Sequence, residues 1–368
     1  MAKIVKSVAN LPVFLATKFP VGLHSQVEDV IQTIKNKSTE VCTIGICGEG
    51  GSGKTTLTKA IYHLVHGTFM DKSFIEDIKQ ISETRGYVHL QEQLLSDLLK
   101  TKVEILNVEM GRSMIRERVS GKKVLIVLDD VPNVCELLNL SECREWFGEG
   151  TVIIVTTRDA NRLRIHKIDS IFRVKEMNEK ECLELLSWHA FREARPKEEY
   201  HYLARSVISY CRGLPLALEV VGSCLFERTA EEWDIVLSKI RKMSYHIWEI
   251  SFYCLGNQMK RDLFLDVCCC FVGEDIAYAT RILNGCGVDA DSGIRVLIDR
   301  NLIKLKNNKL GMHPLLQEMG RQIIHEIRQE EMWKERRLRF DGAEYVLTDN
   351  TVRTFFSRKR FRSHVQCI

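Results

Sequence analysis

The residues of this chain best suited to chemistry lie in segment 48–56, which reads GEGGSGKTT. The segment fits the pattern G-x-x-x-x-G-K-[ST], in which a glycine-rich loop turns its backbone N–H groups toward phosphate oxygens. Lys54 is then expected to reach the β- and γ-phosphates of a nucleotide, and the hydroxyl of Thr55 is expected to bind Mg²⁺. The predicted nucleotide-binding residues of the segment are Gly48, Gly50, Gly51, Gly53, Lys54, Thr55 and Thr56.

The elements on either side of this segment are those that a phosphate-binding loop needs. Residues 41–47 form an apolar run typical of a buried strand. The residues after the loop predict an amphipathic helix, whose apolar face comprises Leu57, Ala60, Ile61, Leu64 and Val65. An ordinary glycine-rich turn is the alternative interpretation, but it gives no packing reason for Lys-Thr-Thr at the start of the helix. We therefore favour a phosphate site.

A second apolar run, residues 123–128, ends in two carboxylates, Asp129 and Asp130. Continuous apolar runs are typical of parallel strands covered on both faces, and ligands bind at the carboxyl ends of such strands. We predict that Asp129 holds the metal and that Asp130 orients or deprotonates an attacking water. The alternative is a plain helix cap before a helix starting near Pro132. The phosphate-binding segment upstream reduces the weight of that alternative.

A third apolar run, residues 151–156, leads to Arg158. A guanidinium at the same edge of the sheet can approach the γ-phosphate, so Arg158 is our second candidate catalytic residue. An ordinary solvated surface arginine explains the spacing equally well, and the sequence leaves this choice open.

The second half of the chain changes to helical patterns beyond about residue 175. Gly213 and Pro215 mark a junction between two helices, because glycine ends helices and proline begins them. From about residue 245 the helices are joined by a predicted hairpin with an Asn307-Asn308 turn, followed by a helix starting near Pro314. Helices with a small hairpin suggest a winged helix. We see no basic stripe on a recognition helix and do not expect nucleic acid as a partner.

Composition sets wider limits on the chain. Its 368 residues are 45% hydrophobic, which is enough for about two or three domains. A net charge of +4 does not imply nucleic-acid binding, and no apolar run approaches the roughly 18 residues of a membrane span. The 13 cysteines are scattered, odd in number and without C-x-x-C spacing, so we expect a reduced interior.

Taken together, these motifs resemble the nucleotide-binding (NB-ARC) region of plant nucleotide-binding leucine-rich-repeat disease-resistance proteins. The chain is most similar to the class with a Toll/interleukin-receptor-like (TIR) domain. The resemblance covers roughly residues 12–350. The ordered motifs that carry it are residues 48–56, 125–131, 156–158, 213–216, 264–267 and 312–314.

The resemblance implies an α/β P-loop NTPase domain, a parallel sheet with flanking helices, followed by a helical subdomain and a winged-helix subdomain. The boundaries that we predict are a linker at 1–20, the P-loop nucleotide-binding domain at 21–174, the helical ARC1 subdomain at 175–244, the winged-helix ARC2 subdomain at 245–340 and a divergent tail at 341–368.

Three further nucleotide-binding residues follow from the resemblance alone. It implies that Val21 lies by the adenine, that Pro215 closes over the adenine, and that His313 reaches a β-phosphate of ADP. Without the resemblance, His313 would be interpreted as a structural histidine. The chain departs from the family in two places, with Gln26 where arginine is common and Pro314 where aspartate is usual. The second departure removes a helix-capping carboxylate.

The function that the resemblance implies is a switch, held closed by ADP and opened by ATP with Mg²⁺. Opening would permit self-association or association with other immune receptors, and we expect at most slow ATP hydrolysis. Two alternatives remain open. One is a conventional P-loop ATPase or kinase, and the other is a truncated protein that binds full-length receptors without using nucleotide.

The ends of the chain carry further expectations. We expect no TIR domain before residue 12, hence no NAD-cleaving site, and no leucine-rich repeat after residue 350. Residues 352–368 resemble nothing in the family and include the short basic cluster Arg358-Lys359-Arg360. We expect the protein in the cytoplasm and leave the nucleus open.

Overall fold

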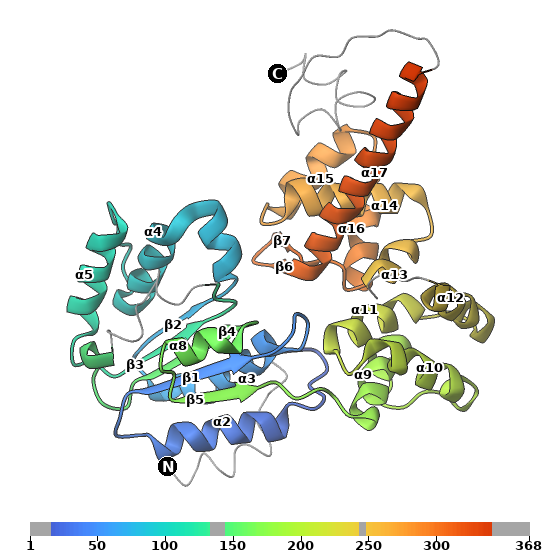
Figure 1. The fold of residues 1–368 in the computed structure, drawn as a ribbon. Coiled ribbons are helices and arrows are strands. Elements are labelled where there is room, and N and C mark those ends of the chain that lie inside the picture. The colour runs from blue at the N-terminus through green and yellow to red at the C-terminus, as the bar shows by residue number, and fades with distance from the viewer. Residues whose placement is uncertain (1–15, 133–143, 243–247, 341–368) are drawn as a thin grey trace. The chain divides into compact units, whose positions relative to one another are not determined.

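The computed structural model describes residues 16–132, 144–242 and 248–340, and these form two compact units (Figure 1). The first comprises the residues up to Leu185 together with Arg212–Leu216, and the second comprises Leu186–Cys211 and the residues from Ala217 on. The predicted helix near Pro132, most of the predicted linker and the predicted tail fall outside the described residues. The three-domain division stays a prediction.

The first unit is built on a five-stranded parallel sheet with the strand order β2-β3-β4-β1-β5. Strands β1, β3 and β4 are buried along their whole length, because helices cover both faces of the sheet. This confirms the predicted fold class. The strands are β1 (Cys42–Cys47), β2 (Asp71–Ile75), β3 (Val124–Leu128), β4 (Val152–Thr157) and β5 (Ser170–Arg173).

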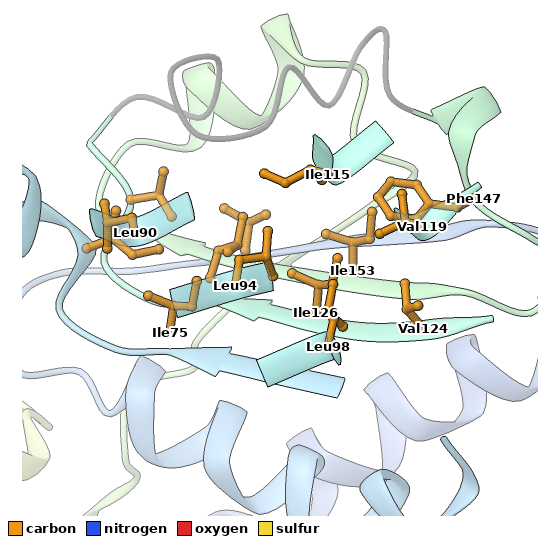
Figure 2. Close-up of a cluster of buried hydrophobic side chains, with 14 of the residues drawn as sticks. Ile75, Leu90, Leu94, Leu98, Ile115, Val119, Val124, Ile126, Phe147 and Ile153 are labelled. Carbon is orange, nitrogen blue, oxygen red and sulfur yellow. The ribbon is translucent and has the colours of Figure 1, made fainter. Parts of the chain in front are cut away.

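Two apolar layers hold the helices of the first unit to the sheet. Helices α4 and α5 pack on one face, where Leu94 and Ile115 meet Ile126 and Ile153 (Figure 2). Helices α2 and α3 pack on the other. The helices are α2 (His24–Asn36), α3 (Lys54–Val65), α4 (Ile78–Leu99), α5 (Val108–Val119) and α8 (Ala160–Ile165), with short 3₁₀ turns at His66–Thr68 and Arg144–Trp146.

Strand β2 is followed closely by helix α4. The strand ends at Ile75, and Ile78 is already the first residue of α4. Asp77 between them adopts a left-handed conformation with φ 53°, which ends the extended chain. The helix itself is interrupted at Gly86, which has φ 78°.

The described residues of the second unit form helices and one hairpin. The hairpin turns at Asn307 and Asn308, both with positive φ, and α17 begins at Pro314, as predicted. Helices α9 (Glu179–Phe191) and α11 (Pro215–Leu225) each run from the first unit into the second. The other elements are a 3₁₀ turn (Glu198–Tyr200), α10 (His201–Cys211), α12 (Ala230–Lys242), α13 (Trp248–Tyr253), α14 (Gln258–Asp266), a π-helix (Val267–Phe271), α15 (Ile276–Gly285), α16 (Ala290–Asp299), β6 (Lys304–Lys306), β7 (Lys309–Gly311) and α17 (Pro314–Phe340).

One disulfide corrects the prediction of a fully reduced interior. It joins Cys224, in the last turn of α11, to Cys254, just after α13. The packing of these two helix ends brings together cysteines that no sequence spacing marks as a pair. Cys42, Cys47, Cys182, Cys268 and Cys270 are not part of a disulfide. Among residues 16–132, 144–242 and 248–340, no helix has the length and apolarity that a membrane span requires.

Candidate nucleotide phosphate site

The glycine-rich loop connects β1 to α3 and leaves the N-terminal end of that helix open to a ligand. Gly51 and Gly53 have φ values of 78° and 92°, a region that other residues rarely adopt. Gly53 is the N-cap residue of α3 and has no side chain to accept hydrogen bonds from the first N–H groups of the helix. Those groups, at the positive end of the helix dipole, suit an anion.

Ser52 provides the observation that tests whether a phosphate fits this loop. Its Oγ is buried and has no hydrogen-bond partner among the described residues. A Cβ at Gly48 would lie 2.8 Å from that oxygen, so any other residue there would displace the Ser52 hydroxyl. Buried polar atoms are nearly always hydrogen-bonded in folded proteins. A phosphate oxygen would accept a hydrogen bond from the Ser52 hydroxyl. The loop therefore fits the phosphate group that its sequence predicts.

Lys54 is buried, with 8% of its surface exposed. Its ammonium donates hydrogen bonds to the carbonyl oxygens of Gly48 and Glu49, at 2.9 and 2.8 Å. Burial lowers the pKa of Lys54, and the nearby charge of Asp130 opposes that shift. The Lys54 ammonium is therefore held against the glycine-rich loop, where it is predicted to bind phosphate.

The two predicted metal-binding residues lie in contact. The hydroxyl of Thr55 donates to the carboxylate of Asp129, 2.8 Å from Oδ2 and 3.1 Å from Oδ1. Asp129 is 1% exposed, and burial raises its pKa while hydrogen bonds from Thr156 and Thr55 lower it in part. A hydroxyl and a carboxylate beside a phosphate loop are oxygen ligands of the kind that Mg²⁺ takes together with phosphates.

No group of three or more His, Cys, Asp or Glu side chains that could hold a metal occurs in the described parts of the chain. A Mg²⁺ site here would take Thr55 and Asp129 from the protein, and phosphate oxygens and waters would complete the coordination.

The two predicted catalytic residues also meet. The Nε of Arg158 lies 3.8 Å from Oδ1 of Asp130, and both side chains are partly exposed to solvent. An ion pair of this kind contributes about 0–1 kcal/mol, so it separates readily. Asp130 has φ 52°, in the left-handed region, and its N–H donates to Thr156 Oγ1 at 2.8 Å.

Of the two residues predicted to lie near the adenine, Pro215 belongs to a segment that adjoins the loop. Pro215 is the first residue of α11, and the N–H of Leu216 donates to Gly51 O at 3.2 Å. Val21 is half-buried and is followed by Gly22, whose φ is 72°. Gln26, one of the two departures from the family, donates to Gly22 O at 3.3 Å and accepts from the N–H of Lys175 at 2.8 Å.

His313 lies in the second unit, and its role toward a phosphate stays a prediction. Its ring Nδ1 accepts a hydrogen bond from the N–H of Leu315 at 3.2 Å. The ring therefore caps α17, which begins at Pro314. The chain thus replaces the capping oxygen that we expected Pro314 to remove.

Sequence reasoning missed two residues of the site. Ser52 counted only as a variable position of the loop, and Thr156 only as the end of a buried strand. A polar residue in an otherwise apolar strand, just before its carboxyl end, was the available signal for Thr156. Its contacts with Asp129 and Asp130 depend on the pairing of β3 with β4, which the sequence does not state.

Parts of the chain are similar to known protein families and to solved structures. Residues 23–195 match the NB-ARC domain, and residues 257–328 match the winged-helix domain of Roq1-like disease resistance proteins. Among solved structures, 80% of the chain aligns with 42% of a Signal Transduction ATPase with Numerous Domains (STAND) protein with a tetratricopeptide repeat sensor from Pyrococcus horikoshii, at 15% identity and a TM-score of 0.48.

Curated relatives are more similar in sequence. The chain is 41% identical over 312 residues to disease resistance protein RUN1 of Vitis rotundifolia, covering 83% of this chain and 23% of that protein. It is 37% identical over 317 residues to TMV resistance protein N of Nicotiana glutinosa, covering 83% and 27%. The chain spans about a quarter of the length of these relatives. It therefore contains an NB-ARC domain, followed by a winged-helix domain of the Roq1-like kind.

Proposed function

We propose that this chain is a nucleotide-binding switch module of plant immune signalling, which holds ADP or ATP together with Mg²⁺. The observation that carries the proposal is the convergence of Lys54, Thr55 and Asp129 on a loop whose buried Ser52 hydroxyl lacks a partner. The similarity to plant disease resistance proteins supports the signalling context. We expect the module to act in the cytoplasm and leave the nucleus open.

Each residue of the site has a role in this proposal. The first N–H groups of α3, the Ser52 hydroxyl and the Lys54 ammonium bind phosphate oxygens, and Thr55 with Asp129 holds the cation. Bound Mg²⁺ supplies positive charge that neutralises the phosphates.

Slow hydrolysis is the second part of the proposal. Asp130 orients a water and accepts its proton, and Arg158, once released from Asp130, meets the γ-phosphate.

The connection between the loop and α11 supports a switch. The N–H of Leu216 binds the Gly51 carbonyl, so a change in the loop on phosphate binding reaches the first turn of this helix directly. Helix α11 continues into the second unit. We propose that ADP keeps the module closed, and that ATP opens it for self-association or for binding other immune receptors.

The most direct experiment identifies the nucleotide released when the purified protein is denatured. We expect close to one ADP per chain, as a switch held in its resting state requires. Rapid turnover of ATP with no retained ADP would favour a conventional ATPase or kinase. A protein that retains no nucleotide and binds none when ATP and Mg²⁺ are added would favour an interaction protein that does not use the site.

A further inference from the structure

Thr156 joins the two aspartates of the site through a single hydroxyl. Its Oγ1 donates to Asp129 Oδ1 at 2.7 Å and accepts from the N–H of Asp130 at 2.8 Å. Its carbonyl oxygen accepts from the N–H of Val131 at 2.9 Å. The residue is fully buried near the end of β4. Three consecutive residues of the acidic turn are thus held by one threonine.

The Thr156 hydroxyl fixes the orientation of the Asp129 carboxylate more directly than any other group in the turn. The terminal torsion of an aspartate is broad, so its two oxygens can turn about the side-chain axis. Thr55 donates to both oxygens of Asp129, at 2.8 and 3.1 Å, and so does not select one orientation by itself. The bond from Thr156 engages Oδ1 and leaves Oδ2 toward Thr55.

The main chain of the turn has other anchors. The carbonyl oxygens of Asp129 and Asp130 accept hydrogen bonds from the N–H groups of Ile78 and Lys79, both at 3.1 Å. These bonds, and the one from Val131 to the carbonyl of Thr156, do not involve the Thr156 side chain. Removing the hydroxyl therefore frees the carboxylate of Asp129 and the N–H of Asp130 while the backbone remains anchored.

We infer that Thr156 is a positioning residue for the metal-bound nucleotide. It holds the Asp129 carboxylate in the orientation in which that carboxylate meets the cation, and it fixes the left-handed Asp130 beside it. The inference rests on the proposed function, because it assumes that Asp129 binds Mg²⁺. The buried Thr156 hydroxyl thereby has a part in metal binding that neither Thr55 nor Asp129 can perform alone.

The test compares Thr156→Val, Thr156→Ser and a matched control, Thr151→Val. Thr151 directly precedes the opposite end of the same strand and is equally buried. Its hydroxyl has the same double role, since it accepts from the N–H of Val124 at 3.2 Å and donates to the carbonyl of Lys122 at 3.1 Å. The control therefore removes a comparable pair of hydrogen bonds away from the aspartates.

Calorimetry with a non-hydrolysable ATP analogue, in EDTA and over a series of Mg²⁺ concentrations, gives the readout. We expect Thr156→Val to need about 10- to 100-fold more Mg²⁺ for half-maximal strengthening of binding, as loss of a partner of a metal ligand typically does. Its affinity in EDTA should match that of the parent. Thr156→Ser should recover most of the effect, and Thr151→Val should show the Mg²⁺ requirement of the parent.

Several results would overturn the inference. An unchanged Mg²⁺ requirement in Thr156→Val would do so, and so would an equal loss of affinity with and without Mg²⁺, which indicates a structural role only. If Thr156→Val does not fold, Thr156→Ala removes the same hydroxyl without adding volume, and the same criteria apply. A parent protein that binds no nucleotide at all refutes the proposed function, and the inference with it.

Discussion

At the scale of single residues, burial works against the charges that the site needs. It lowers the pKa of Lys54 and raises the pKa of Asp129, so in both cases the charged form is the one disfavoured. Bound phosphates would stabilise the ammonium, and a bound cation would stabilise the carboxylate. A bound anion and a bound cation together would therefore offset the cost of burying these two charges, which neither would offset fully alone.

The first prediction concerns Lys54→Ala. We expect affinity for ADP and ATP to fall about 10- to 100-fold, since hydrogen bonds to charged groups contribute about 1.5–3 kcal/mol. Lys72→Ala is the matched control, because its ammonium also donates to two backbone carbonyls, those of His66 and Phe69. Calorimetry measures both variants. Equal affinities in the parent and both variants would contradict the phosphate assignment.

The second prediction concerns Asp130→Asn. The amide keeps the size of the side chain but does not accept a proton, so hydrolysis of ATP should slow by about 100-fold or more while ATP binding persists. Asp159→Asn is the control, because Asp159 caps the nearby helix α8 and asparagine caps equally well. Single-turnover measurement of phosphate release compares the three proteins. Identical rates in all three would exclude Asp130 as the residue that positions water.

At the scale of elements, the junction of β1, the loop and α3 depends on backbone conformation more than on side chains. A methyl group at Gly53 would meet only Pro215, at an ordinary 3.7 Å, so space does not require glycine there. The φ of 92° does, because a side chain is strained in that conformation. The conformation directs the first turn of α3 at the predicted phosphate position.

The third prediction follows for Gly53→Ala. We expect the unfolding free energy to fall by about 1 kcal/mol or more, and nucleotide affinity to fall with it, since the loop must change path. Gly67→Ala, just past the other end of α3, has nothing within 4 Å of the added methyl and no positive φ, and it should behave as the parent does. Thermal unfolding and calorimetry give the two readouts. A Gly53→Ala protein that retains both properties would show that the loop tolerates the strain.

The fourth prediction concerns the opposite edge of the sheet, where Asp169 ties β5 to β1. Its Oδ2 accepts from the N–H and the hydroxyl of Thr43, at 2.8 and 2.9 Å, and its Oδ1 accepts from Arg144 at 2.6 Å. Burial raises the pKa of Asp169, but hydrogen bonds from Thr43 and Arg144 lower it by more, and it lies below its ordinary value. The carboxylate therefore contributes stability above the unfolded pKa near 3.9, and that contribution is lost as the pH falls below it.

We accordingly expect the melting temperature of Asp169→Asn to lie below that of the parent at neutral pH. The two curves should begin to converge as the pH falls below about 4, and they should continue to converge down through the lowered pKa of folded Asp169. Parallel curves over that range would show that the carboxylate adds nothing that depends on its charge.

At the scale of the whole molecule, the proposed switch requires that the second unit responds to the nucleotide. His313 is the residue through which the resemblance implies this response. Because its ring also caps α17, a simple truncation changes two things at once. The experiment must therefore separate contact with ADP from the start of a helix.

The fifth prediction makes that separation with two variants. His313→Ala loses the cap and the ring, whereas His313→Asn loses the ring but supplies one of the best capping side chains. If the ring meets ADP, both variants release it about tenfold faster, the change expected for about 1.4 kcal/mol of lost interaction. Release is followed by stopped-flow fluorescence of a labelled ADP. Faster release in the alanine variant alone would show that His313 acts only as a cap.

The sequence by itself determined the parts of this protein that depend on neighbouring residues. The phosphate loop, the buried parallel strands, the Asn307-Asn308 hairpin and the start of α17 all follow from side-chain periodicity or from residues suited to particular backbone angles. These signals depend on only a few neighbouring residues, so they can be recognised without knowledge of the fold.

Tertiary structure alone decided how distant segments complete the site. The hydroxyl of Thr156 reaches Asp129 and Asp130 only because β3 and β4 pair in one register, and Leu216 reaches Gly51 only because α11 begins beside the loop. The disulfide between Cys224 and Cys254 likewise depends on the packing of helix ends. Such contacts join residues far apart in sequence through strand pairing and close packing. No local pattern in the chain specifies them.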